Sequence, residues 1–236
     1  MKDDFGDRMK HYENRKIRDS YSGHEPLYMR LDGRSFSKLT RKLKLEKPRD
    51  QRFAACFEDA ILETMKEFNF VFGFHQSDEI SFCFPVLAPE ENSQLPFNGL
   101  TRKILSVVPS FFTSSFLRSF NKEFPEFDTN ICFDARLVEF PAKFECVNMI
   151  VWRYQDARRN YITDLAATRF SHKQLMGMST LERLEKVSDI FDINDVADFY
   201  VKKEVDYGDY SRKRIFKKKV DFNSLEFEEK MEMVYG

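Results

Sequence analysis

The chain has 236 residues, of which 42% are hydrophobic and 26 are phenylalanine, so it carries enough apolar material for a packed core and is not a disordered chain. Its formal net charge of −1 gives no overall sign of a polyanionic partner, so any basic surface must come from local segregation of charge. No apolar run is long enough to span a bilayer, the charged N-terminus lacks a signal-peptide pattern, and the four cysteines form no CxxC pair. These features predict a cytoplasmic protein with free thiols and no membrane partner.

The first strong element is an apolar run over residues 27–31 that alternates into Asp32-Gly33. It predicts a strand stopped by a turn, because glycine tolerates positive φ. Apolar residues then recur at helical spacing over 49–68. Two short apolar runs flank the polar segment 76–79, which predicts a hairpin.

A second helix is predicted over 99–120, with Pro109 expected to kink or interrupt it, and a further strand over 136–140. The order is therefore strand, helix, strand, strand, helix, strand. That order indicates an α+β protein of the ferredoxin-like type, with an antiparallel sheet covered by helices on one face. Polymerase palms and nucleotidyl cyclases use this fold, but so do many unrelated proteins, so the fold alone does not assign a function.

The C-terminal third is less regular. One long helix is expected over 143–169, a shorter one over 179–190, and a basic β-like segment over 210–222. We therefore expect a palm-like catalytic core over 1–142 and a smaller helical and β appendage over 143–236 packed on it, although a single domain fits the sequence as well.

Three acidic residues are the first candidates for chemistry. Asp32 ends the first strand, and Asp78 and Glu79 lie in the hairpin loop before the third. In a split βαβ sheet these strands are central neighbours, so the carboxylates converge at one edge of the sheet. Facing carboxylates repel one another unless a cation lies between them, and oxygen ligands favour Mg²⁺. Either acidic segment alone is typical of an ordinary solvated turn; only their convergence indicates a metal site.

A phosphate-binding loop is predicted directly after Asp32. Residues 33–37 enter a short helix-like stretch, and backbone N–H groups at such a turn can hold a triphosphate. Lys47 and Lys103 are candidate phosphate partners. The four histidines show no metal-ligand spacing; for His75, which precedes the acidic hairpin loop, both a substrate contact and ordinary packing stay open.

Several segments together resemble the tRNA-His guanylyltransferase family. They are RLDGRSF at 30–36, EKPRD at 46–50 and QSDEISF at 76–82, followed by FDAR at 133–136 and by Trp152-Arg153 with Asp156 and Asn160. The family patterns at these places are RxDGRxF, EKPND, GQSDEYSF, FDGR and WRQxDxxxNN. The resemblance extends from about residue 25 to 165.

The resemblance implies a palm that adds nucleotides to the 5′ end of tRNA in the 3′-to-5′ direction, with two Mg²⁺ ions and with ATP, GTP and other nucleoside triphosphates as substrates. It implies a homotetramer and the following site residues. Catalytic residues are Asp32, Asp78 and Glu79; metal ligands are Asp32, the carbonyl of Gly33 and Asp78; nucleotide contacts are Asp32, Gly33, Arg34, Ser35, Phe36, Ser37, Lys47, Ser77, Asp78 and Lys103.

Contacts to tRNA are expected from two sources. Arg136, Arg153 and Asn160 match family positions, and Arg158 lies beside them on the predicted long helix. The basic residues Arg212, Lys213 and Arg214 are candidates for binding the phosphate backbone, because cations gain affinity by releasing condensed counterions. A solvated strand face or an assembly surface explains the basic run equally well.

One departure from the family narrows the expected activity. Enzymes dedicated to tRNA-His carry HINN where this chain has Arg158-Arg159-Asn160-Tyr161. The family's downstream DKNE segment has no counterpart either, and in its place stand His172-Lys173-Gln174-Leu175, Gly177 and Ser179. These residues look like the bacterial and archaeal guanylyltransferase-like branch, which implies template-dependent repair of 5′-truncated tRNA. Three alternatives stay open: untemplated addition of G at position −1 of tRNA-His, a nucleotidyl cyclase, and an RNA-binding protein without catalysis.

Overall fold

The computed structural model describes residues 3–47, 49–90, 93–190, 196–208 and 210–236. Pro48, within the predicted 46–50 motif, lies outside the described residues. In chain order the elements are α1 (Asp4–Glu13), β1 (Leu27–Gly33), α2 (Phe36–Leu43), α3 (Gln51–Glu67), β2 (Phe72–Gln76), β3 (Glu79–Cys83), a 3₁₀ helix η1 (Pro96–Gly99), α4 (Thr101–Glu123), β4 (Phe133–Glu139), α5 (Lys143–Arg169), α6 (His172–Leu175), α7 (Thr180–Val187), β5 (Asp198–Asp206), β6 (Ser211–Lys218) and α8 (Phe227–Tyr235).

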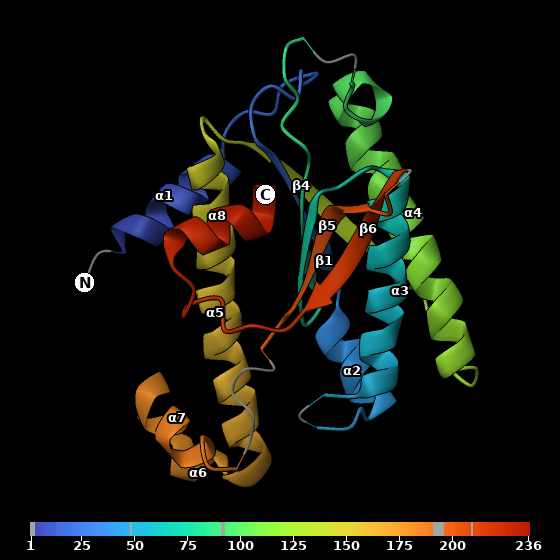
Figure 1. Ribbon diagram of the computed structural model, residues 1–236. Coiled ribbons are helices and arrows are strands. Elements are labelled where there is room, and N and C mark those ends of the chain that lie inside the picture. The colour runs from blue at the N-terminus through green and yellow to red at the C-terminus, as the bar shows by residue number, and fades with distance from the viewer. Residues whose placement is uncertain (1–2, 48, 91–92, 191–195, 209) are drawn as a thin grey trace.

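The six strands form an antiparallel sheet in the order β4-β1-β3-β2-β5-β6 (Figure 1). Its first four strands, connected by α3 and α4, confirm the predicted ferredoxin-like arrangement, with β1 beside β3 at the centre. The predicted basic segment is β6, but β5 has no counterpart among the predicted elements. Both strands extend the sheet beyond β2, so segments before and after residue 142 share one sheet.

Helices cover both faces of this sheet (Figure 1). The face toward α3 and α4 packs a phenylalanine-rich core that includes Phe57, Phe82 and Phe116. The opposite face packs against α5, α8 and α1 around residues such as Phe74 and Tyr154. The expectation of helices on one face is therefore incomplete: successive strand residues point to opposite faces, and both sets are apolar here.

The long helix α5 matches its predicted range, and α7 begins as predicted. Ser179 is the N-cap of α7: its hydroxyl oxygen accepts a hydrogen bond from the Glu182 N–H, and the Glu182 carboxylate accepts one from the Ser179 N–H. Of the two effects predicted for Pro109, a kink or an interruption, the interruption is wrong, because α4 continues through that residue. No helix in the described ranges is both long enough and apolar enough to cross a membrane.

The end of β1 differs from the expectation in one informative way. The strand continues through Gly33, and the positive φ of the following turn is at Ser35 (62°). Gly33 is required for a different reason: a Cβ at this position would lie 2.3 Å from the Phe36 ring. The ring of Phe36, itself 3% exposed, therefore packs directly against the backbone at the end of β1.

Candidate active site

The strand order places Asp32 and Asp78 at the same edge of the sheet. β1 pairs with β3 so that Asp32 lies opposite Glu79, the residue after Asp78. The Gly33 N–H donates a hydrogen bond to the Asp78 carbonyl oxygen at 3.0 Å, which ties the end of β1 to the β2–β3 turn. The predicted convergence of these acidic segments is present in the fold.

The electrostatics at this edge favour a bound cation. Burial raises the pKa of the Asp78 carboxyl above its usual value, and the negative charges of Asp32 and Glu79 raise it further. In the described part of the chain, no three His, Cys, Asp or Glu side chains converge as a closed metal cage. Two half-buried carboxylates at an open cavity instead suit Mg²⁺, which retains waters and phosphate oxygens as ligands.

Glu79 is held by arginines. Its two carboxylate oxygens accept hydrogen bonds from Arg153 Nε and Nη2 at 2.7 and 2.6 Å, and Arg30 Nε lies 3.9 Å from Oε2. Arg30 also pairs with Glu13 of α1 at 2.5 Å. Glu79 and Arg153 are both buried, so the fold fixes this carboxylate beside Asp78.

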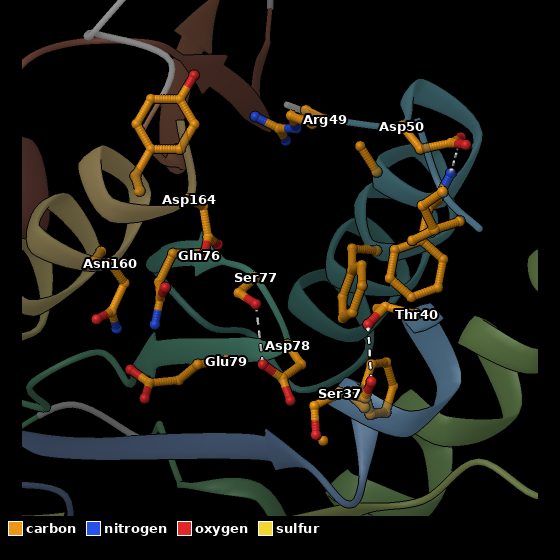
Figure 2. Close-up of a pocket in the computed structure, with 18 of the residues that line it drawn as sticks. Ser37, Thr40, Arg49, Asp50, Gln76, Ser77, Asp78, Glu79, Asn160 and Asp164 are labelled. Atoms are coloured by element: carbon orange, nitrogen blue, oxygen red, sulfur yellow. Dashed lines mark hydrogen bonds between the residues drawn. The ribbon is translucent and has the colours of Figure 1, made fainter. Parts of the chain in front are cut away.

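These residues border a cavity of about 1060 Å³. Four of its five cationic side chains come from α2 and the segment leading to α3: Arg41, Lys44, Lys47 and Arg49. The fifth, Arg153, comes from α5. The α5 side contributes Asp156, Asn160 and Asp164. Figure 2 shows Asp78 between the start of α2, marked by Ser37, and the α5 side, marked by Asn160.

The loop after β1 reaches the cavity through Ser35, Phe36 and Ser37. Arg34 does not line it, and its N–H donates to the Cys132 carbonyl oxygen at 3.0 Å, so this amide is already used within the protein. The remaining N–H groups at the start of α2 provide the positive end of a helix for phosphate.

The structure separates the predicted site residues into two sets. Those that line the cavity are Asp32, Gly33, Ser35, Phe36, Ser37, Lys47, Ser77, Asp78, Glu79, Arg153 and Asn160. Those that do not are Arg34, Lys103, Arg136, Arg158, Arg212, Lys213 and Arg214. Lys103 lies near the start of α4 with its ammonium 6.0 Å from the Phe97 ring centroid. Arg136 lies 3.8 Å from Glu13.

Sequence reasoning missed three cationic residues of the cavity, Arg41, Lys44 and Arg49. Arg41 and Lys44 are three residues apart at the end of α2 and its C-cap, a spacing that places side chains on one face of a helix. That spacing was a usable signal, whereas Arg49 lies in an irregular connection whose direction the sequence does not predict.

A protein-family model described as tRNAHis guanylyltransferase matches residues 6–141 of the chain. An uncharacterized protein from Acanthamoeba polyphaga mimivirus is 30% identical over 205 residues, which are 78% of this chain and 69% of that protein. A "probable tRNA(His) guanylyltransferase" from Dictyostelium discoideum is 36% identical over 137 residues, or 57% of this chain and 51% of that protein. The matched part is thus about half the length of that relative.

Among solved structures, a bacterial tRNA(His) guanylyltransferase-like protein in complex with ATP has a TM-score of 0.74 and 25% sequence identity. The match covers 98% of this chain and 99% of that chain. The similarity therefore extends over the C-terminal third, which the family model does not reach.

Proposed function

The chain belongs to the tRNAHis guanylyltransferase family, and from that premise we propose that it adds nucleotides to the 5′ end of tRNA in the 3′-to-5′ direction, with the growing end templated by the opposite strand. The observation that carries the proposal is the pair Asp32 and Asp78 at the edge of a cavity to which α2 and the segment before α3 contribute four cationic side chains. That combination suits a metal-bound triphosphate.

The proposed reaction has two transfers. An oxygen of the tRNA 5′-phosphate attacks the α-phosphorus of ATP or GTP, and pyrophosphate leaves. The 3′-hydroxyl of an incoming nucleoside triphosphate then attacks the phosphorus of the activated tRNA end, loses its proton, and nucleoside monophosphate leaves. The cavity volume of about 1060 Å³ supports simultaneous binding of a nucleotide and the tRNA terminus.

Two bound Mg²⁺ ions, when present, would polarise the phosphoryl group and lower the pKa of the attacking hydroxyl. Asp32, Asp78 and the Gly33 carbonyl are the proposed ligands. Ser35, Phe36 and Ser37 would hold the triphosphate through the start of α2, with Lys47 and Ser77 beside it. Glu79 is proposed to act by position, since Arg153 binds both its oxygens.

For tRNA, we propose Asn160 at the α5 side of the cavity and Arg136, Arg158 and the β6 residues on surfaces outside it. Arg34 and Lys103 are retained as proposed nucleotide contacts from outside the cavity lining. Arg153 is proposed to contribute indirectly, by holding the Glu79 carboxylate.

The proposed homotetramer would be seen as four protomers by light scattering of the eluted protein, and a monomer in that measurement would reject it.

The deciding experiment supplies Mg²⁺, ATP, the four nucleoside triphosphates and a monophosphorylated tRNA that lacks its first nucleotide opposite an intact 3′ strand. We expect extension by the complementary nucleotide, lost in Asp78→Ala. Addition of G alone, and only to full-length tRNA-His, would favour the dedicated guanylyltransferase instead.

Two further outcomes would reject nucleotide addition altogether. Cyclic nucleotide formed from triphosphate without RNA would identify a cyclase. RNA binding that survives Asp78→Ala, with no product from either RNA, would identify a binding protein.

A further inference from the structure

His75 lines the cavity and lies three residues before Asp78. It is part of β2 and is 4% exposed. Its ring stacks on Phe57 of α3, with centroids 4.5 Å apart and an interplanar angle of 25°. Nε2 lies 3.0 Å from the carbonyl oxygen of Ser77, the residue directly before Asp78.

The partner atoms determine which nitrogen carries the proton. The Ser77 carbonyl only accepts hydrogen bonds, so Nε2 must be the donor. Nδ1 makes no hydrogen bond and lies 3.9 Å from Asp198 Oδ2. Burial, with the nearby Arg49 charge, lowers the pKa of His75 to about 4, so the ring is neutral near pH 7.

Asp198 would otherwise draw a second proton onto this ring. It is 1% exposed and lies opposite His75 in the β2–β5 register. Arg49 forms an ion pair with its Oδ2, and Lys217 Nζ lies 3.5 Å from the same oxygen. These cations balance the buried carboxylate, which leaves the imidazole free to act as a neutral, single donor.

The turn that accepts this hydrogen bond contains a backbone conformation that is disfavoured for residues with a Cβ atom. Ser77 has φ of 51° at the first central position of a two-residue hairpin turn, where glycine is usual. A residue with a side chain is strained in this region and persists there only where its surroundings stabilise it. Ser77 Oγ in turn donates to Asp78 Oδ1 at 3.1 Å (Figure 2).

We infer that His75 is a positioning residue that fixes the Ser77–Asp78 turn, and thereby the Asp78 carboxylate, for binding a divalent cation. The chain of contacts runs from the His75 N–H to the Ser77 carbonyl, and from the Ser77 hydroxyl to the Asp78 carboxylate. A second anchor, the Gly33 N–H on the Asp78 carbonyl at 3.0 Å, holds the other side of the turn. The inference rests on the proposed cation site, but it concerns a residue that lines the cavity without being a proposed ligand.

The test measures Mn²⁺ affinity, with and without ATP, from the electron paramagnetic resonance signal of free Mn²⁺ in solutions of the full chain. His75→Leu keeps a similar volume and removes the donor. We expect its dissociation constant for Mn²⁺ to rise about tenfold, the lower end of the usual cost of removing an outer-shell partner. His75→Gln should restore affinity to within about threefold, because its amide nitrogen is as many bonds from Cβ as the histidine Nε2.

A control separates positioning from general loss of packing. Phe74→Leu removes buried volume from the same strand on the opposite face of the sheet, and we expect it to leave Mn²⁺ affinity unchanged. In the nucleotide-addition assay His75→Leu should raise the Mg²⁺ concentration for half-maximal rate and leave the KM for ATP within about twofold.

Three results would overturn the inference. Unchanged Mn²⁺ affinity in His75→Leu would do so, as would a weakened affinity that His75→Gln fails to restore, since the ring would then act by packing alone. Absence of Mn²⁺ binding by the unmodified protein would reject the cation site itself. That last outcome is separate from the first two, in which the unmodified protein still binds the metal.

Discussion

The N–H of Gly33 and the carbonyl oxygen of Asp78 are joined by a hydrogen bond of 3.0 Å, although 45 residues separate them in the chain. This bond connects the last residue of β1 to the turn between β2 and β3. The two acidic segments are therefore linked through the backbone as well as through the register of β1 and β3. Their separation depends on strand pairing and is little affected by side-chain rotation.

Gly33→Ala should disturb this link. A Cβ there would lie 2.3 Å from Cδ2 of Phe36, and that ring is packed among Phe53, Phe116 and Phe133. Because the ring cannot withdraw without leaving the core, we expect a loss of about 1–3 kcal/mol in unfolding free energy. Urea denaturation measures it. Gly73→Ala is the control, since its Cβ would meet the flexible Met65 sulfur at 3.1 Å. Equal losses in the two variants would contradict the explanation.

Asp78→Asn should separate stability from activity. Burial and the Asp32 charge raise the pKa of Asp78 in the folded state, so the ionised form is disfavoured at pH 7 and a neutral isostere removes that cost. We expect the Tm without divalent cation to rise by about 1–2 °C, while nucleotide addition is lost. Scanning calorimetry and the tRNA assay measure these two effects. Asp128→Asn, in an exposed loop, should change neither property.

The Arg153–Glu79 pair gives a sharper stability prediction. Arg153→Met removes the hydrogen-bonded cation from the buried Glu79 carboxylate and leaves Arg30 beside it, with Nε 3.9 Å from Oε2. We therefore expect the unfolding free energy to fall by about 3–5 kcal/mol. The double variant Arg153→Met/Glu79→Gln removes both charges and should recover a large part of it. Arg159→Met breaks the exposed pair with Asp156 and should cost less than about 1 kcal/mol. Chemical denaturation measures these unfolding free energies. If the double variant is no more stable than Arg153→Met, the charge explanation is contradicted.

Local patterns predicted the centre of this fold well. Helical spacing gave α5 over its full length, and alternation gave β1, β2, β3 and their order. β5 was missed because its adjacent Lys202 and Lys203 interrupt alternation, although the strand is paired on both sides. The acidic pair was predictable because topology alone brings it together. The Glu79–Arg153 pair was not, because the partners are 74 residues apart and nothing in either segment specifies the other.

As the pH is lowered from neutral, protonation of His75 in the unfolded chain should destabilise the protein before the ion-paired carboxylates of the protein are protonated. The folded-state pKa of His75 is about 4, below the unfolded value near 6.5, because the ring is buried and Arg49 is close. As the pH falls, the unfolded chain therefore binds the proton first. The contribution of the neutral His75 ring to the unfolding free energy is present above about pH 6.5 and is lost progressively between pH 6.5 and 4. One proton gives a slope of up to about 1.4 kcal/mol per pH unit. Thermal unfolding across this range should show a smaller slope in His75→Gln; an identical slope would reject the assignment.

The β5–β6 hairpin provides the last prediction, on tRNA affinity. Arg212, Lys213 and Arg214 are exposed on the edge strand β6, and Arg214 lies 5.3 Å from the Tyr207 ring centroid. If these cations neutralise phosphates, changing all three to glutamine should weaken tRNA binding and reduce the slope of log K against log salt by about 2–3, because fewer counterions are released.

Filter binding at several salt concentrations measures the slope. The matched control changes three exposed lysines of helices α1, α3 and α4, namely Lys10, Lys66 and Lys122, to glutamine. It removes the same charge from the whole molecule, so a general electrostatic effect would lower the slope equally in both triples. A change confined to the β6 triple would assign the basic strand to RNA. Unchanged affinity and slope would leave it as a solvated face or an assembly surface, and light scattering of the β6 triple then distinguishes those two roles by whether the protomer number falls.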